Sequence, residues 1–376
     1  MKNKLICLIA FAMPFPTMLN AVGPLKETIK INPTSEKHVT IQQISDQVEF
    51  LPIITEKNIF LNEVSKIIDS DSSFFLFSRT TPGIYQFNKK GVMQKSITDV
   101  GKGPGQINNP LDVCLTNNRL IVLQNRLLII YDHNLNYKNS IKLPFFASRI
   151  ESVNDKKLIL YLNNYHITHF QAIVELNGDN ISQILYFQKK PNTLTRYCGT
   201  QPRNYQKISD QVIFSSLWSD TVFNIKDTTL YTRWIIDFGK YKLLPNTYTK
   251  ISKDPYTASQ ELENSGKAHR VENFIESDKY LVFQYCFGNR KPKQVIVNKS
   301  SHDIKLNGYV YDEKNEPIEL DIIGTFNNKI AILLDVDDLL LLKKSTLTND
   351  MNGKWKDLFK TIDTLDENSN PILLYF

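Results

Sequence analysis

The chain has 376 residues, of which 41% are hydrophobic, 22% charged and 11% aromatic, and its formal net charge is +6. This composition excludes a disordered chain, and the sequence lacks the repeated long apolar segments of a membrane-spanning bundle. Lys and Arg are scattered without a nucleic-acid-reading motif, so we expect no nucleic-acid partner. A soluble globular monomer of one large domain or two smaller ones fits this length.

The N-terminal segment is typical of an export signal. Lys2 and Lys4 precede an apolar run from Leu5 to Met18, and the small-residue sequence Leu19-Asn20-Ala21 follows. The run is too short for a spanning helix, and an ordinary buried strand is the alternative interpretation. We expect residues 1–21 to be a signal peptide cleaved after Ala21, which places the mature protein in the periplasm or outside the cell.

The mature chain, residues 22–376, keeps a net charge of +4 because the signal removes two Lys and no acidic residue. A lipoprotein signal needs a Cys at the cleavage point, but Cys7 lies inside the apolar run, so we expect no lipid anchor. The remaining Cys114, Cys198 and Cys286 lack the CxxC spacing of zinc and redox sites. Cys114 and Cys286 lie in apolar runs, and we expect both to be buried as small hydrophobic side chains.

Six short polar turns divide the mature chain, and each lies between two apolar or β-branched runs, which is the pattern of a β-hairpin. The turns begin at Asp69, Thr116, Asn154, Ser209, Ser277 and Asn327. The runs after them, such as FFLFS and RLIVLQ, are continuously apolar, as is typical of strands buried on both faces. Intervals of roughly 40 to 65 residues are those of propeller blades with insertions.

Four of the six units continue with a third strand and then a fourth, as in GIYQFNKKG followed by VMQKSI. Four antiparallel strands make one propeller blade. Helical periodicity occurs only from Trp355 to Leu365 and from Asp254 to Glu263, and we interpret both segments as insertions. The terminal strand NPILLYF, from Asn370, has no following partner, and VEFLPI, from Val48, has no preceding one.

Pairing of these two end strands would close a ring and remove its open edges. The sequence therefore predicts an all-β fold in which residues 22–376 form a single six-bladed β-propeller. Its blades are four-stranded and antiparallel, its ring is closed by the N- and C-terminal strands, and its helical insertions are short.

With these elements placed, the chain resembles the six-bladed β-propeller family, related in shape to NHL-repeat proteins, that is abundant among exported proteins of Bacteroides-type bacteria. Four stretches carry the resemblance: VEFLPI, VGKGPGQ from Val100, SDTVFNIKDTTLYTRWIIDFGKYKLLP from Ser219 to Pro245, and NPILLYF. The resemblance implies the fold and export. It implies no catalytic residues, because the family has no settled activity. Many members are lipoproteins, and the missing Cys at the cleavage point is a departure from that pattern.

The glycine-rich stretch VGKGPGQINNP, from Val100 to Pro110, is the closest approach to a nucleotide-binding motif. A phosphate-binding loop ends in GK[ST] and opens a helix, whereas Pro104 removes a backbone donor and a strand follows. We therefore interpret Gly101, Gly103 and Gly105 as the crossover from the first blade to the second.

No catalytic or metal-binding pattern stands out. His166 and His169 are three residues apart and would point to opposite faces of a strand. No HExxH, GxSxG or SxxK arrangement occurs, and the acidic run DVDD at Asp335 lacks the glycine and distal Glu of a calcium loop, so we interpret it as a solvated turn. We expect no cofactor and no bound metal.

The candidate ligand site follows from blade geometry. The loops joining the second and third strands of the blades lie on the same face as the crossovers and ring one mouth of the central channel. Arg binds carboxylates and phosphates, and aromatic side chains stack on sugars. These loops carry Arg79, Arg126, Tyr165, His166, Trp218, Arg290 and Lys291.

We therefore expect an exported binding or interaction module that recognises an anionic small molecule, a glycan or a protein partner at this mouth. Packing of the same side chains against neighbouring strands is the alternative, which would leave a structural scaffold. A propeller enzyme, either a lyase or a glycan-active enzyme with a metal in the channel, is the other alternative.

Export can be tested on the native N-terminus. Mass spectrometry of the protein isolated from its source is expected to show a chain that starts near Val22 without a lipid. An unprocessed Met1 in the cytoplasmic fraction would contradict the signal-peptide interpretation.

Overall fold

The structure is a computed structural model, and it describes most of residues 26–376. The residues outside the described set are 1–25, 46, 57–58, 60, 62, 118, 163–165, 167, 179, 190–202, 217–218, 245–246, 248–253, 289–290, 312–316, 319, 345–352 and 366–368. In the part described, no helix is long and apolar enough to cross a membrane.

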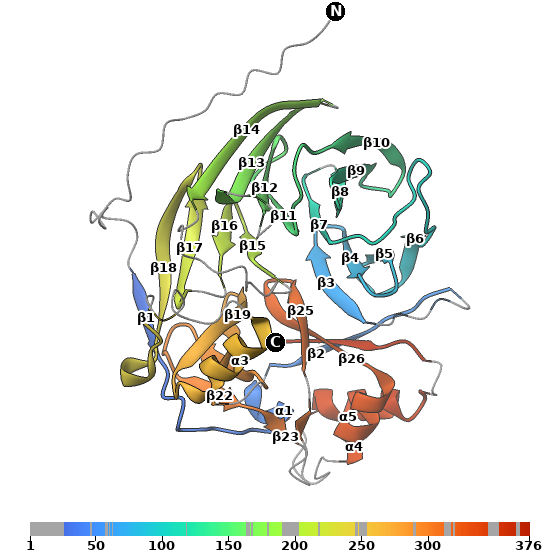
Figure 1. The fold of residues 1–376 in the computed structure, drawn as a ribbon. Coiled ribbons are helices and arrows are strands. Elements are labelled where there is room, and N and C mark those ends of the chain that lie inside the picture. The colour runs from blue at the N-terminus through green and yellow to red at the C-terminus, as the bar shows by residue number, and fades with distance from the viewer. Residues whose placement is uncertain are drawn as a thin grey trace, which may run out of the picture.

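Six four-stranded antiparallel sheets surround a central axis as the blades of a propeller, which confirms the predicted fold (Figure 1). Blades 1 to 3 contain β3 (Val64–Asp69), β4 (Ser73–Ser78), β5 (Gly83–Asn88) and β6 (Met93–Ile97); β7 (Asp112–Leu115), β8 (Arg119–Gln124), β9 (Leu127–Asp132) and β10 (Tyr137–Lys142); and β11 (Arg149–Ser152), β12 (Lys157–Tyr161), β13 (His169–Asn177) and β14 (Asn180–Lys189). Blades 4 to 6 contain β15 (Tyr205–Ile208), β16 (Gln211–Phe214), β17 (Thr221–Lys226) and β18 (Thr229–Asp237); β19 (Ala268–Glu276), β20 (Tyr280–Phe287), β21 (Lys293–Asn298) and β22 (Ile304–Gly308); and β25 (Asp321–Phe326), β26 (Lys329–Leu334), β27 (Ile372–Tyr375) and β2 (Glu49–Pro52). The first strand named in each blade is the innermost.

All six predicted polar turns connect the first strand of a blade to its second. We call the end of the channel that these turns surround the hairpin mouth. The loops between second and third strands lie at the opposite end of the strands, together with the crossovers between blades, and we call that end the crossover mouth.

Each blade is apolar on both faces because it packs between two neighbours. In β4, Phe74 and Leu76 contact blade 6, whereas Phe75 and Phe77 contact blade 2. A separate hydrophobic cluster fills each of the six junctions between adjacent blades. Cys114 lies in one of these clusters, and both Cys114 and Cys286 are buried, as the apolar runs predicted.

The two ends of the chain close the ring as predicted. β2 pairs antiparallel with β27, from Glu49 opposite Tyr375 to Pro52 opposite Ile372, and so completes blade 6. The side chains of β27 are all buried. β27 lies between β2 and β26, so the C-terminal strand is inside the sheet and β2 forms its outer edge.

The N-terminal segment adds a feature that the sequence analysis missed. β1 (Glu27–Lys30) pairs parallel with β18 and becomes a fifth strand on blade 4. The chain then bridges to blade 5 at Lys37, opposite Asn307, before it enters blade 6 as β2. This segment therefore ties together the outer edges of three blades.

The helices are insertions on the β framework. The described helices are α1 (Ile41–Ile44), the short 3-10 turn η2 (Gly239–Tyr241), α3 (Pro255–Asn264), α4 (Val336–Lys344) and α5 (Gly353–Ile362). The two predicted helical segments correspond to α3 and α5, and α5 buries Trp355, Leu358, Phe359 and Ile362 as its periodicity requires. A minor two-stranded hairpin, β23 (Val310–Tyr311) and β24 (Pro317–Ile318), lies between blades 5 and 6 in the chain.

The DVDD run is not the solvated turn that we expected. It begins α4, where the Asp335 carboxylate accepts a hydrogen bond from the amide of Asp338 at 2.8 Å. Asp337 and Asp338 lie in the first turn of this helix, where the helix dipole favours negative charge. The acidic residues therefore start a helix that packs beside blade 6 (Figure 1).

The glycine-rich stretch is the predicted crossover between β6 and β7. The amide of Gly101 donates to the carbonyl of Ile107 at 3.1 Å, which folds the loop back on itself. Gly105 has a φ of +73°, and a Cβ there would lie 2.9 Å from the Cβ of Tyr137. A left-handed backbone and this close contact both require glycine, so the stretch turns the chain.

Candidate functional site

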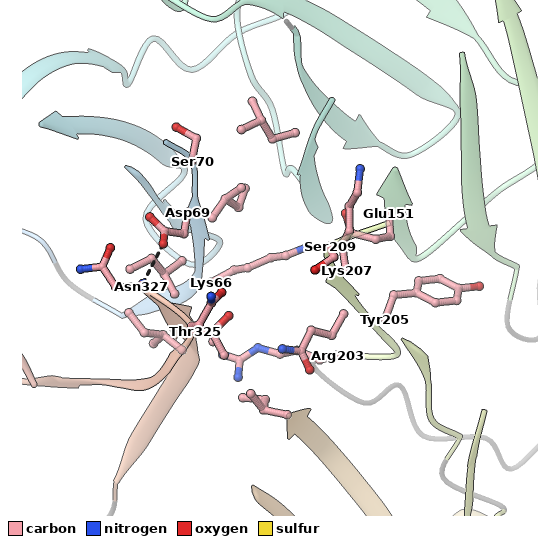
Figure 2. A pocket seen from close by; sticks show the side chains of 18 of the residues that line it. Lys66, Asp69, Ser70, Glu151, Arg203, Tyr205, Lys207, Ser209, Thr325 and Asn327 are labelled. Carbon is pink, nitrogen blue, oxygen red and sulfur yellow. Dashed lines mark hydrogen bonds and ion pairs between the residues drawn. The ribbon is translucent and has the colours of Figure 1, made fainter. Parts of the chain in front are cut away.

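A cavity with a volume of about 860 Å³ lies at the hairpin mouth (Figure 2). Four of the six polar turns contribute to its rim, through Asp69, Ser70, Asp71, Thr116, Asn117, Ser209, Asn327 and Asn328. Its wall is built from the inner strands, which carry Lys66, Glu151, Tyr205, Lys207 and Thr325. Hydroxyl, amide and charged groups therefore dominate its lining.

Lys66 crosses the channel wall from blade 1 toward blades 2 and 3. Its ammonium group lies 3.2 Å from the Asp112 carboxylate and 3.5 Å from that of Glu151, and it donates to the Val113 carbonyl at 2.7 Å. Burial lowers the pKa of Lys66, but the two carboxylates outweigh this effect and hold that pKa above its usual value. The three side chains thus form a charged link between the inner strands of three blades.

Arg203 spans the channel. It lies just before β15 in blade 4, yet its guanidinium donates to the Ser65 carbonyl of blade 1 at 2.8 Å and to the Ile322 carbonyl of blade 6. Its Nε is buried and has no hydrogen-bond partner among the described residues. Burial lowers the pKa of Arg203 to about 10, with a contribution from nearby Arg149 and opposition from Asp321 and Asp112, so the group stays cationic at neutral pH.

Arg203 also lines two smaller cavities, of about 340 and 260 Å³, toward the crossover mouth. It therefore separates the channel into two compartments. In the 340 Å³ cavity, the amide oxygen of Asn273 is a second buried polar atom without a hydrogen-bond partner in the described part of the chain. Asn273 has a φ of +53° and lies where the pairing of β19 with β20 is irregular. The local distortion of this inner strand therefore sets the direction of the Asn273 side chain.

Two cations of the 860 Å³ cavity have no carboxylate partner among the described residues. Lys89 pairs with Asp69, and Lys66 pairs with Asp112 and Glu151. By contrast, Lys207 donates to the Ser152 hydroxyl at 3.1 Å, and Arg203 donates to carbonyls. Uncompensated positive charge inside a partly enclosed cavity attracts anions.

Glu276 holds the wall of this cavity in place. Its carboxylate accepts from Arg233 at 2.7 Å, from the Trp234 indole at 2.9 Å and from Lys299 at 3.0 Å. Its backbone exchanges hydrogen bonds of 2.7 and 2.8 Å with the side chain of Gln206, which lines the cavity. Burial raises the pKa of Glu276, but these donors outweigh it and hold that pKa below its usual value.

The structure brings only part of the predicted site together. Arg79 lies at the β4–β5 turn and lines the 260 Å³ cavity at the crossover mouth. Arg126 instead donates to the carbonyls of Leu143 and Pro144 and lies 5.5 Å from the Phe146 ring. The part of Arg126 in ligand binding stays a prediction.

Two further predicted residues lie outside the lining of that cavity. The ring of His166 stacks on Tyr186 with centroids 4.6 Å apart, and exposed Lys291 lies 5.4 Å from the Tyr309 ring. Tyr165, Trp218 and Arg290 are outside the described residues. The binding role of all five also stays a prediction.

Sequence reasoning missed the channel residues Lys66, Arg149, Arg203 and Lys207. Each is a single basic residue on or beside an otherwise ordinary first strand. Their position on or beside the strand that precedes a polar turn could have identified them, because the first strands of the blades line the axis of a propeller.

Among the described residues, no group of three or more His, Cys, Asp or Glu side chains could hold a metal ion. The Asp112 and Glu151 carboxylates are instead paired with Lys66 and with backbone amides. The described lining therefore offers no ligand set for a metal-dependent propeller enzyme.

Comparison with known proteins agrees with this architecture. A candidate exported protein of Bacteroides fragilis has a crystal structure that matches with a TM-score of 0.75 at 17% identity, over 93% of this chain and 98% of that one. A member of the DUF4221 family from Bacteroides vulgatus matches with a TM-score of 0.51 at 11% identity, over 88% and 97%. No curated protein sequence matches the chain.

A family model described as a domain of unknown function, DUF4934, matches residues 26–376. The chain belongs to the DUF4934 family. The match covers all six blades, so the channel and both of its mouths lie within the DUF4934 domain.

The role of Glu276 can be tested by Glu276→Gln, which keeps the shape but removes the charge that binds Arg233 and Lys299. The free energy of unfolding is expected to fall by about 2–3 kcal/mol at neutral pH. Folding lowers the pKa of Glu276, so the loss of unfolding free energy in the variant is complete above the unfolded pKa of about 4.3. This loss disappears as the pH falls through the pKa of Glu276 in the folded protein.

Chemical denaturation at several pH values measures this effect. Glu175→Gln is the matched control, because Glu175 has no ion pair among the described residues and should change stability by less than about 0.5 kcal/mol. Equal losses in the two variants would show that the Glu276 carboxylate does not hold the wall.

Proposed function

We propose that this protein is an exported binding module that holds a polar, acidic ligand, such as an acidic glycan, in the hairpin-mouth cavity. The observation that carries the proposal is the 860 Å³ cavity with the cations Lys207 and Arg203, neither of which is paired with a carboxylate among the described residues. This volume lies within the usual range of ligand sites, about 300–1,000 Å³.

The other lining groups suit hydroxyl recognition. Thr116, Ser209 and Thr325 provide hydroxyls, and Asn117 and Asn327 provide amides that both donate and accept. Sugars present hydroxyls of the same kind, and an acidic sugar adds a carboxylate for the cations.

Export is the second part of the proposal. The basic, apolar and small-residue segments at residues 1–21 support it. The fold is shared with a candidate exported protein, which agrees with the same location. A protein partner that presents an acidic side chain at this mouth is the other class of ligand that the lining suits.

A glycan array followed by thermal-shift titration tests the binding site. An acidic glycan at 100 times its Kd should stabilise the native protein by about 2.7 kcal/mol. Lys207→Ala should weaken binding by about 10-fold or more, because a charge-assisted hydrogen bond contributes about 1.5–3 kcal/mol.

Lys156→Ala is the matched control. Lys156 is an exposed lysine in the β11–β12 turn at the same mouth, outside the cavity lining, so its loss should leave affinity unchanged. Glycans that bind Lys207→Ala as well as the native protein would refute binding in this cavity.

A further inference from the structure

The 260 Å³ cavity at the crossover mouth lies on the other side of Arg203 from the hairpin mouth. Its lining contains three arginines from three blades: Arg79 of blade 1, Arg149 of blade 3 and Arg203 of blade 4. We propose that this cavity is a second site, which binds the carboxylate or phosphate group of a small molecule. The proposal does not depend on what occupies the hairpin mouth.

The charge of this lining is strongly positive. Lys66 and the three arginines face one acidic residue, Asp112. The Asp112 carboxylate already accepts from Lys66 at 3.2 Å and from the amides of Val113 and Ile150 at 2.8 and 3.0 Å. These three donors therefore use most of the hydrogen-bonding capacity of the Asp112 carboxylate, and little of it remains for an arginine.

Two of the arginines retain unused donors. Arg79 is exposed and has no hydrogen bond or ion pair within the described part of the chain. Arg203 directs its two terminal nitrogens to the carbonyls of Ser65 and Ile322, and its buried Nε has no acceptor within the described ranges. A buried donor without an acceptor is costly, so an acceptor at this position would stabilise the folded protein.

The site is built rather than accidental. Arg149 is buried, and its guanidinium is fixed by a 2.5 Å hydrogen bond to the Ser148 carbonyl. Its charge nevertheless acts on Arg203, where it helps burial to lower the pKa. Cations that repel one another in a cavity are stabilised together by a bound anion.

The size and remaining chemistry of the cavity indicate a compact oxyanion. Its volume is below the range of about 300–1,000 Å³ that holds a whole drug-sized ligand, so it suits one acidic group. The hydroxyls of Ser65 and Thr80 can donate to further oxygens. Planar guanidinium groups bind carboxylate and phosphate through paired hydrogen bonds.

Isothermal titration of the purified protein with inorganic phosphate and with citrate, at low and high ionic strength, tests the site. We expect at least one of the two to bind, with an affinity that falls as salt is raised. Phosphate alone would identify the site as phosphate-selective, citrate alone as carboxylate-selective, and either result supports the proposal.

Arg79→Ala should weaken this binding by about 10-fold or more. Because Arg79 is exposed on a turn, this variant should fold normally, which a melting curve checks. Lys142→Ala, which removes an exposed lysine from outer strand β10, should bind as the native protein does.

Two results would overturn the proposal. One is the absence of binding by both anions at millimolar concentration. The other is an affinity of Arg79→Ala equal to that of the native protein. Neither result would bear on glycan binding in the 860 Å³ cavity.

Discussion

The fold depends on one constraint, which is that every blade is apolar on both faces and must be covered twice. A sheet of this kind cannot end an open stack, because its outer face would remain exposed to water. The six junction clusters satisfy the constraint only if the last blade contacts the first. Pairing of β2 with β27 provides this closure by building blade 6 from both ends of the chain.

Ring closure creates the channel, and the channel creates the site. The side chains of β4 are all buried in contacts with adjacent blades, whereas the first strands converge on the axis. Polar residues on those first strands, such as Lys66, Glu151 and Lys207, therefore face one another although they are far apart in the sequence. Most of their charges are paired across blades, which couples the geometry of the site to the stability of the ring.

Arg203 gives the channel its asymmetry. By binding carbonyls of blades 1 and 6 from blade 4, it divides the channel into a large cavity with mixed charges and smaller cavities toward the crossover mouth. The two compartments differ in chemistry. Hydroxyl and amide groups dominate the first, and guanidinium groups dominate the 260 Å³ cavity.

The sequence was informative where structure is local. Polar turns between apolar runs predicted the six hairpins, and the three- and four-residue spacing around Trp355 predicted α5. It was less informative where strands far apart in the sequence pair, as β1 does with β18. It was also less informative where a polar run can form either a turn or the start of a helix, as at Asp335.

The candidate site was only partly predictable for the same reason. Arg79 was found because it lies in a loop whose position in a blade is known in advance. Arg149 and Arg203 were missed because their convergence depends on ring geometry and on the conformation of single side chains, which no sequence period encodes.

The central claim is that the channel is a binding site rather than a packed axis. A crystal structure grown in the presence of citrate tests it most directly. We expect a carboxylate group of citrate in the channel, within hydrogen-bond distance of Arg79 and Arg203. Citrate confined to the outer strands, with the channel closed by its own side chains, would contradict the account and leave the protein as a scaffold.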